Sequence, residues 1–423
     1  MSAPAMTLRS STPQQRRTLI AASLGWMLDA FDVMLYSMVL AHIMRDLGMS
    51  KAEAGWLNTL TLVASGLGGL LFGFLADRMG RTRALMLSIL TYSVCSFASG
   101  LSTSILMLAV FRFILGLGMG GEWNTGATLV AETWPTELRA KAIAVVQSSW
   151  AIGYALAAIV AGVVMRYYPW RVVFFVGVLP ALVLFWMYKQ VPESEMWQEH
   201  HRLASESQRV AAAQRHYESA SFARLFSPQF RKPTLALLFM NFFGMFGWWG
   251  LFTWIPSYLS LPVEQGGRGF GLMGTTTLMV VLNLVGMFPG YASFGWVADK
   301  FGRRPAFLVY LFAAAALVPF YAMARSAASI LVLGSLVAFF GTGFFSGSGI
   351  IGSEIFPTYI RARALGFTYP GARMLSSVSP FLIGLLAQSS RGLSGAFYVC
   401  SAAFFLAGIT ASLLPETRGK ELE

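Results

Sequence analysis

Gly73-Phe-Leu-Ala-Asp-Arg-Met-Gly-Arg-Thr-Arg83 separates two long apolar runs with one acidic residue and three arginines. A closely matching stretch, Gly295-Trp-Val-Ala-Asp-Lys-Phe-Gly-Arg-Arg304, returns later in the chain, and the leading glycines are 222 positions apart. Each copy lies between apolar segments that are long enough to cross a membrane. A charged turn that recurs at a fixed offset between such segments is typical of a duplicated membrane protein.

The overall composition also indicates a membrane protein. Of the 423 residues, 56% are hydrophobic and 12% are charged, whereas a soluble domain carries about 25% charged residues. Because a soluble fold cannot hide this much apolar surface, lipid must be part of the solvent. A spanning helix needs roughly 20 apolar residues. The length therefore suits an all-α membrane protein with twelve transmembrane helices.

The apolar runs fall into two groups of six. We expect a first half over residues 1–189 and a second half over 233–423, joined by a polar linker over 190–232. The expected spans are residues 18–42, 54–76, 83–101, 106–130, 141–165, 171–189, 234–260, 272–298, 305–325, 328–354, 363–388 and 394–414.

The basic residues flank these apolar runs, so the net charge of +12 indicates orientation and not a nucleic-acid surface. If both termini are inside, the inner segments hold 22 Lys and Arg and the outer loops hold seven. This asymmetry predicts that both termini and the linker are cytoplasmic in a multi-pass cell-membrane protein. Cys95 and Cys400 fall within apolar runs, which favours neither a disulfide nor a metal site.

A second pair of motifs repeats at the same offset. Glu132-Thr-Trp-Pro-Thr-Glu-Leu-Arg139 returns as Glu354-Ile-Phe-Pro-Thr-Tyr-Ile-Arg361, again 222 positions later. The halves also end alike, with Pro192-Glu-Ser194 in the first and Pro415-Glu-Thr417 in the second. We therefore expect two parallel repeats, related by an axis along the membrane normal.

These paired motifs resemble those of the major facilitator superfamily over nearly the whole chain. Asp29-Ala-Phe-Asp32, Gly121-Glu-Trp123, Glu132-Thr-Trp-Pro135 and Pro192-Glu-Ser-Glu-Met-Trp197 are similar to segments of its sialate and lactate proton symporters. The closing Pro415-Glu-Thr-Arg-Gly-Lys-Glu-Leu422 also resembles the sugar porters. The resemblance implies the fold of that superfamily and transport of a small solute by alternating access.

Acidic residues in the middle of the first span are candidates for proton coupling. Asp29 and Asp32 are three positions apart, so they share one helix face. A carboxylate at the bilayer centre costs about 2.5–3.5 kcal/mol, so such groups usually have a function. The resemblance implies that Asp32 corresponds to the proton-coupling aspartate of sugar–proton symporters. The alternative is a pair of structural carboxylates bonded to neighbouring helices.

Arg112 and Glu122 lie in the fourth expected span. An arginine cannot be neutralised in a protein, so it needs a partner. In the porters that this chain resembles, the matching arginine pairs with the unprotonated first-helix aspartate, which implies an Asp32–Arg112 coupling pair. The alternative is that Arg112 reaches the outer surface. Glu122 is a further candidate for a proton site.

Arg373 lies near the centre of the eleventh span, with no obvious acidic partner in the second half. Because an unpaired buried cation is costly, we expect an anionic substrate to complete it, or else a carboxylate from another helix. The ionisable groups of the first half would then handle protons while the second half recognises the solute. Further candidate substrate contacts are Asn124, Asn241, Trp248, Trp249, Trp254, Asn283 and Tyr369.

The sequence thus predicts a proton-coupled symporter that imports a small organic anion, such as a monocarboxylate or sialate. A sugar–proton symporter and a transporter-like solute sensor are the alternatives. We expect a monomer in the lipid bilayer that is not an enzyme and has no cofactor, metal or nucleic-acid partner. The charged turns would hold one conformation through ion pairs, or only fix the loops. Their gating candidates are Asp77, Arg78, Gly80, Arg81, Glu132, Arg139, Asp299, Arg303, Glu354 and Arg361.

Overall fold

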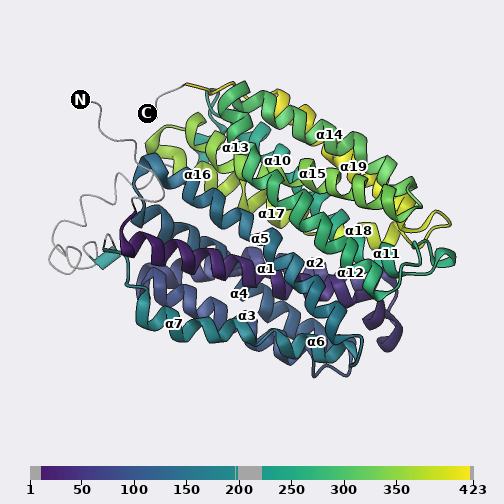
Figure 1. Cartoon of the computed structure of the whole chain (residues 1–423). Coiled ribbons are helices and arrows are strands. Elements are labelled where there is room, and N and C mark those ends of the chain that lie inside the picture. The colour runs from purple at the N-terminus through teal and green to yellow at the C-terminus, as the bar shows by residue number, and fades with distance from the viewer. Residues whose placement is uncertain (1–10, 196, 199–221, 420–423) are drawn as a thin grey trace.

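The computed structural model describes residues 11–195, 197–198 and 222–419, without the side chains of a few helical residues. Within these ranges all regular structure is helical, as Figure 1 shows. Ten helical segments are long and apolar enough to cross a membrane. The shorter α3 and the interrupted column α16–α18 bring the number of helical columns to the twelve predicted. Much of the predicted linker lies outside the described residues.

The first half forms six columns, the last of them broken into short helices. These are α1 (Pro13–Leu47), α2 (Lys51–Met79), α3 (Arg81–Ser99), α4 (Ile105–Thr133), α5 (Thr136–Val164) and the series α6 (Trp170–Val176), η2 (Leu179–Leu182) and α7 (Val183–Gln190).

The second half follows the short η3 (Phe222–Phe226), and three of its columns are interrupted. The columns are α10 (Arg231–Phe252) with α11 (Ile255–Ser260), then α12 (Leu272–Val281) with η5 (Leu282–Met287) and α13 (Phe288–Phe301), α14 (Arg303–Met323), α15 (Ala327–Ile355), the series α16 (Thr358–Thr368), α17 (Pro370–Ser376) and α18 (Ser379–Leu386), and α19 (Gly392–Ser412).

The repeat extends to the helix caps. Ser104 precedes α4 and accepts a hydrogen bond from the backbone N–H of Met107, at 3.2 Å. At the equivalent place before α15, Ser326 accepts from the N–H of Ser329, at 3.1 Å. Each serine satisfies a helix-start donor that would otherwise lack a partner. The same local signal therefore starts the same long helix in both halves.

The two halves pack against each other through α2 on α18 and through α5 on α12 and α13. In Figure 1 the described chain ends lie together at one end of the bundle, called here the terminal end. At the opposite end, Lys51 donates to the carbonyls of Gln265 (2.9 Å) and Ala387 (3.3 Å) in the second half. The hydroxyl of Tyr154 donates to the carbonyl of Phe252, at 2.7 Å. The Lys51 bonds join the halves at that end, and the Tyr154 bond joins them farther inside the bundle.

Glycines allow α2 and α4 to touch along their backbones. A Cβ at Gly120 would lie 1.8 Å from the carbonyl oxygen of Ser65, and one at Gly68 would lie 2.0 Å from that of Leu117. No side chain fits at such a distance, so the helices approach as closely as small residues permit. By contrast, a Cβ at Gly349 of α15 would meet nothing within 4 Å.

Gly120→Ala is expected to lower the melting temperature of the detergent-solubilised protein by several degrees, because the new methyl group forces α2 and α4 apart. Gly349→Ala is the matched control and should leave the melting temperature unchanged or slightly higher, since alanine favours helix. Differential scanning fluorimetry compares the two variants. Equal melting temperatures would show that the α2–α4 contact does not depend on Gly120.

Candidate functional site

A narrow cavity of about 20 Å³ lies between the two halves. Both halves contribute to its wall, through α1 and α5 of the first and α10, α13, α15, α16–α17 of the second. The lining is mostly aromatic with a few polar groups, which is typical of a small-molecule site. The lining residues are Trp26, Gln147, Trp150, Met245, Trp248, Trp249, Tyr291, Phe345, Tyr369 and Arg373.

Four tryptophans of this wall form a continuous set of ring contacts across the interface. The ring centroids of Trp26 and Trp150, both in the first half, are 4.7 Å apart. Trp150 contacts Trp248 at 6.1 Å and Trp249 at 6.0 Å, each nearly edge to face. The flat faces and edges of such rings suit contact with a planar or ring-shaped solute.

Arg373 is the charged residue among the described residues that line the cavity. It lies on α17, a two-turn helix that starts at Pro370, and Pro380 opens the next helix after a short break. Because proline cannot continue the helical hydrogen bonds of the preceding turn, the column is interrupted on both sides of Arg373. Its Nε and Nη2 are buried and have no hydrogen-bond partner among the described residues.

Two acidic side chains of the first half lie beside this cavity. Glu122 packs against the backbone of Gly25, where a Cβ would lie 2.5 Å from its Oε1. Asp29 follows the cavity residue Trp26 by one helical turn on the same face of α1. Both oxygens of Asp29 and Oε2 of Glu122 are buried without a hydrogen-bond partner in the described chain. Both carboxyl groups interact electrostatically with Arg373.

The expected ion pair between Asp32 and Arg112 is absent from this structure. Asp32 instead accepts a hydrogen bond from the hydroxyl of Ser96, at 2.9 Å. The guanidinium of Arg112 lies over the ring of Tyr36, 4.7 Å from its centroid, and its three nitrogens have no described hydrogen-bond partner. Both side chains are fully buried. A ring face attracts the cation and so substitutes in part for the missing carboxylate.

Of the predicted solute contacts, Trp248, Trp249, Tyr369 and Arg373 line the cavity, whereas three others are bonded elsewhere. Trp254 donates its indole N–H to the carbonyl of Pro380, at 3.0 Å. Asn283 donates to the carbonyl of Met279 within the same column, at 2.8 Å. Asn241 accepts from the hydroxyl of Ser348, at 2.6 Å, which joins α10 to α15. The side chain of Asn124 lies outside the described part of the chain.

We expected the first half to handle protons and the second half to recognise the solute. The cavity wall is not divided in this way, because Trp26, Gln147 and Trp150 come from the first half. The 222-residue offset could have identified two of these three residues from their equivalents in the second half. It relates Trp26 to Trp248 and Gln147 to Tyr369, and it also relates Trp123 to Phe345. Trp26 contacts Trp123 at 4.6 Å, and Trp248 contacts Phe345 at 5.7 Å. The wall is thus partly built from equivalent positions of the repeat.

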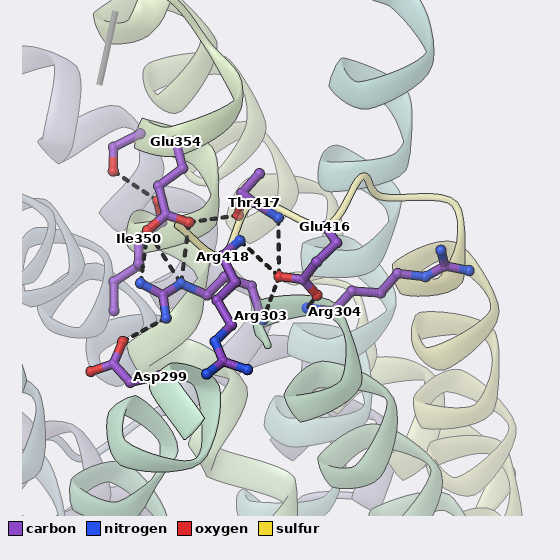
Figure 2. A network of polar contacts seen from close by, with 9 residues as sticks. Asp299, Arg303, Arg304, Ile350, Glu354, Glu416, Thr417 and Arg418 are labelled. Carbon is purple, nitrogen blue, oxygen red and sulfur yellow. Dashed lines mark hydrogen bonds and ion pairs between the residues drawn. The ribbon is translucent and has the colours of Figure 1, made fainter. Parts of the chain in front are cut away.

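The charged turns form one network in each half. Figure 2 shows Arg303 between Asp299 (2.5 Å) and Glu354 (3.0 Å) in the second half. In the first half, Arg81 lies between Asp77 (2.5 Å) and Glu132 (3.1 Å). The Arg81–Glu132 and Arg303–Glu354 pairs agree with the ion pairs expected among the gating candidates, but each of the four pairs joins helices of a single half. They therefore fix the terminal end of each half as a unit.

The remaining gating candidates make local contacts. Arg78 lies over the ring of Phe74, 4.2 Å from its centroid. Arg361 donates from Nε to the carbonyl of Phe356 (3.0 Å), and Arg139 reaches the equivalent carbonyl of Trp134 at 3.5 Å. These contacts stabilise the turn that precedes each helix.

A second glutamate in each half caps a helix start, which the sequence analysis missed. Glu193 accepts from the backbone N–H groups of Arg81 (2.7 Å) and Thr82 (3.0 Å) at the start of α3. Glu416 accepts likewise from Arg303 (2.9 Å) and Arg304 (3.0 Å) at the start of α14, as Figure 2 shows. The negative charge complements the positive end of the helix dipole. The Pro-Glu-Ser and Pro-Glu-Thr ends thus serve as caps.

The glycine that ends each motif makes room for this cap. Gly80 and Gly302 both have φ of +107°, a conformation that other residues rarely adopt. A Cβ at Gly80 would lie 2.1 Å from Oε2 of Glu193, and one at Gly302 would lie 2.7 Å from Oε2 of Glu416. Both the backbone angle and the adjacent carboxylate therefore require glycine.

The chain belongs to the Major Facilitator Superfamily, whose family model matches residues 22–293 and 269–423. The match covers both halves, and the chain is accordingly a multi-pass membrane protein of a transporter family. A structural comparison agrees: a solved D-xylose-proton symporter superposes with a TM-score of 0.78 at 20% identity, over 97% of this chain and 100% of that one.

Three relatives carry names that state a solute. A relative from Cupriavidus pinatubonensis, named a probable 4-methylmuconolactone transporter, is 34% identical, over 98% of this chain and 94% of the relative. A niacin transporter of Acinetobacter baylyi is 30% identical, over 96% and 95%. A sialic acid transporter of Escherichia coli is 32% identical, over 93% and 92%. Over at least 93% of its length, this chain is similar to proteins whose names describe transport of small organic acids.

Glu416 should stabilise the protein as a carboxylate. Partial burial alone would raise its pKa, but hydrogen bonds from the N–H groups of Arg418, Arg303, Arg304 and Thr417 lower it below the usual range. The stabilisation is therefore full above the unfolded-state pKa of about 4.3 and is lost as the pH falls through the lower folded-state value.

Glu416→Gln is expected to lower the melting temperature at pH 7, because a neutral amide is a weaker cap. The difference from the unsubstituted protein should shrink below about pH 4, where its carboxylate becomes protonated. Thermal unfolding in detergent at both pH values measures this, with the exposed Glu264→Gln as the control. Identical melting temperatures at pH 7 would rule out a stabilising cap.

Proposed function

We propose that this chain imports a small organic anion together with protons by alternating access, with both termini in the cytoplasm. The observation that carries the proposal is the Arg373 guanidinium in an aromatic cavity between the halves, where its Nε and Nη2 have no hydrogen-bond partner among the described residues. In this conformation two of its nitrogens lack a hydrogen-bond acceptor. A solute with an anionic oxygen group would supply one.

A carboxylate matches Arg373 in both charge and shape. The planar guanidinium donates two parallel hydrogen bonds to the two oxygens of a carboxylate. Leaving a cation buried without a partner is strongly unfavourable, so a bound anion would gain more here than in water. Trp150 and Trp248 would hold the apolar body of the solute, and Gln147 and Tyr369 offer further polar contacts.

The relatives support an organic acid as the solute. Muconolactone and niacin, named for two of the relatives, are compact unsaturated acids, and sialic acid also carries a carboxylate. A carboxylate is the feature that these solutes share. The wall of this chain pairs one guanidinium with four tryptophans. That wall favours a compact, flat monocarboxylate over a polyhydroxylated acid.

Proton coupling would use the buried acids of the first half. Asp29, Asp32, Glu122 and Arg112 are all nearly inaccessible to solvent. Arg112 interacts electrostatically with Asp29 and Asp32. Acids in such positions mark proton pathways in membrane proteins. The sugar–proton symporter whose fold this chain shares makes proton symport a natural expectation for the same architecture.

Alternating access would arise from rocking of the halves around the central cavity. The Lys51 bonds close the opposite end in the present conformation, and the Tyr154 bond joins the halves farther inside the bundle. The turn networks around Arg81 and Arg303 keep the terminal end of each half rigid during that motion. Their gating role is therefore to preserve the halves as units, and the bonds at the opposite end must break when the cavity opens there.

A sugar–proton symporter is the second candidate, favoured by the fold of the xylose symporter. Sugars need many hydrogen bonds, since each hydroxyl that is buried without a partner costs free energy. The cavity offers Gln147, Tyr369 and Tyr291 besides Arg373, and the rest of its described wall is aromatic or apolar apart from indole N–H groups. This composition of the cavity wall favours an organic acid over a sugar as the solute.

Proteoliposome uptake of nicotinate, sialate and D-xylose, with and without an inward proton gradient, tests the proposal. We expect gradient-stimulated uptake of nicotinate and no uptake of xylose. Gradient-driven xylose uptake without uptake of either acid would establish the sugar symporter instead.

Arg373→Gln is expected to weaken nicotinate binding by about 100-fold, because the variant loses a charged hydrogen-bond donor in a buried site. Arg325→Gln is the matched control, since Arg325 lies exposed in the loop before α15. Binding to the purified proteins is measured by quenching of tryptophan fluorescence. Equal affinity of Arg373→Gln and the control would remove Arg373 from the solute site.

A further inference from the structure

Three tryptophans of the cavity wall have an indole N–H group that is buried and has no hydrogen-bond acceptor in the described chain. They are Trp26 on α1, Trp150 on α5 and Trp248 on α10. Their exposed fractions are 6%, 2% and 1%, so bulk solvent does not supply the acceptor. A buried indole N–H usually has a partner, because leaving a buried donor unpaired costs free energy.

Two other buried indoles, outside the cavity, are paired. Trp254 donates to the carbonyl of Pro380, and Trp134 donates to the carbonyl of Gln15, each at 3.0 Å. Over the described ranges, the buried indole N–H groups without an acceptor all belong to the cavity wall. The missing acceptors are therefore a property of the cavity and not of tryptophan packing throughout the bundle.

Water in the cavity does not satisfy all of these donors. The cavity volume of about 20 Å³ has room for about one water molecule. The oxygen of that water accepts about two hydrogen bonds, one for each lone pair. The wall has five nitrogen atoms without an acceptor among the described residues, since Nε and Nη2 of Arg373 add to the three indoles. An occupant with several acceptor atoms therefore matches this wall.

Trp150 and Trp248 are better placed to bind a solute than Trp26. Trp26 lies one turn before Asp29 on the same face of α1, and both oxygens of Asp29 also have no partner in the part of the chain that the structure describes. A small shift of either side chain can pair these two residues with each other. Trp150 and Trp248 contact each other across the interface, with ring centroids 6.1 Å apart. Their N–H groups therefore remain for an occupant of the cavity.

Trp150 lies on the side of the cavity opposite Arg373. The 222-residue offset relates Trp150 to Ala372, the neighbour of Arg373, and it also relates Gln147 to Tyr369, which both line the cavity. The columns α5 and α16–α17 are thus equivalent in the two halves. Equivalent columns of parallel repeats approach the central axis from opposite sides. A solute bound to Arg373 by its carboxylate therefore presents its far end to Trp150.

Indole N–H groups select for acceptor atoms that carry no hydrogen. A ring nitrogen or a carbonyl oxygen accepts from an indole and brings no donor that needs a partner of its own. A solute hydroxyl also accepts, but its hydrogen then needs an acceptor, and the side-chain acceptors of the described wall are the oxygens of Gln147, Tyr291 and Tyr369. A hydrocarbon ring would leave the indoles unpaired, and a site built for hydrogen bonds rejects such an analogue.

We infer that the indole N–H groups of Trp150 and Trp248 bind a second acceptor atom of the solute, at the end remote from its carboxylate. The cavity is narrow in this conformation, so the two indoles receive the solute when the halves move apart. This assignment rests on the proposed function and narrows the solute class to a compact acid with a ring nitrogen or a carbonyl oxygen away from its carboxylate. Arg373 then supplies the charge, and the two tryptophans determine specificity.

The test compares nicotinate with benzoate on the purified full chain in detergent near neutral pH, by isothermal titration calorimetry. The two monoanions differ in one ring atom, which is an unprotonated nitrogen in nicotinate and a C–H group in benzoate. We expect nicotinate to bind about 10-fold more tightly, the effect of one hydrogen bond to an otherwise unpaired donor. Burial of apolar surface alone would favour benzoate.

Benzoate that binds as tightly as nicotinate, or more tightly, would exclude a bound second acceptor and leave the organic-acid function intact. If neither acid binds, the proposed function fails, and the assignment of the two tryptophans fails with it.

Trp150→Phe and Trp248→Phe each keep an aromatic ring and remove one indole N–H. In these variants the ratio of nicotinate affinity to benzoate affinity should fall several-fold, because nicotinate loses a donor that benzoate does not use. Trp296→Phe is the matched control, since Trp296 is 62% exposed on α13, and it should keep the ratio. If both cavity variants keep the full preference for nicotinate, Trp150 and Trp248 do not bind its ring nitrogen.

Discussion

The cost of an unbalanced charge inside a membrane is the constraint on which the rest of this structure depends. Arg373 and Arg112 are permanently positive. All three side-chain nitrogens of Arg112 and two of those of Arg373 have no hydrogen-bond partner among the described residues. The nearby acids Asp29, Asp32 and Glu122 are as deeply buried. Because both oxygens of Asp29 and two nitrogens of Arg373 have no hydrogen-bond partner in the described chain, we propose that a proton or an anionic solute changes the balance of these charges. A site whose charges were all paired in short salt bridges would not respond in this way to a proton or a solute.

The repeat supplies the scaffold that holds this site. In each half a glutamate caps the third helix of the half, a glycine with positive φ leaves space for the cap, and an arginine bridges two acids. These contacts keep the terminal end of each half rigid, and the cavity then forms where two rigid halves meet. The motifs that dominate the sequence are thus structural, while the ionisable residues that we propose for solute and proton binding are not duplicated by the repeat.

Much of this architecture could be predicted from the sequence, and the limits have physical causes. The 222-residue offset predicted two halves. The free-energy cost of burying a charge in a membrane identified the candidate functional residues, which are Asp29, Asp32, Arg112, Glu122 and Arg373. The sequence could not predict how deep each side chain lies in the bundle or which way it points, because the helical columns break at positions such as Thr253 and Tyr369. Trp254 therefore bonds to Pro380 and does not face the cavity. Applied to aromatic residues, the same offset would have found Trp26 from Trp248 and Gln147 from Tyr369.

The proposed transport depends on an organic anion that binds at Arg373 between the two halves. An experimental structure of the protein with bound nicotinate tests it most directly. We expect the carboxylate within hydrogen-bond distance of Arg373 and the ring of nicotinate among Trp26, Trp150 and Trp248. Nicotinate bound elsewhere, or Arg373 paired with Asp29 or Glu122 while nicotinate is bound, would contradict it.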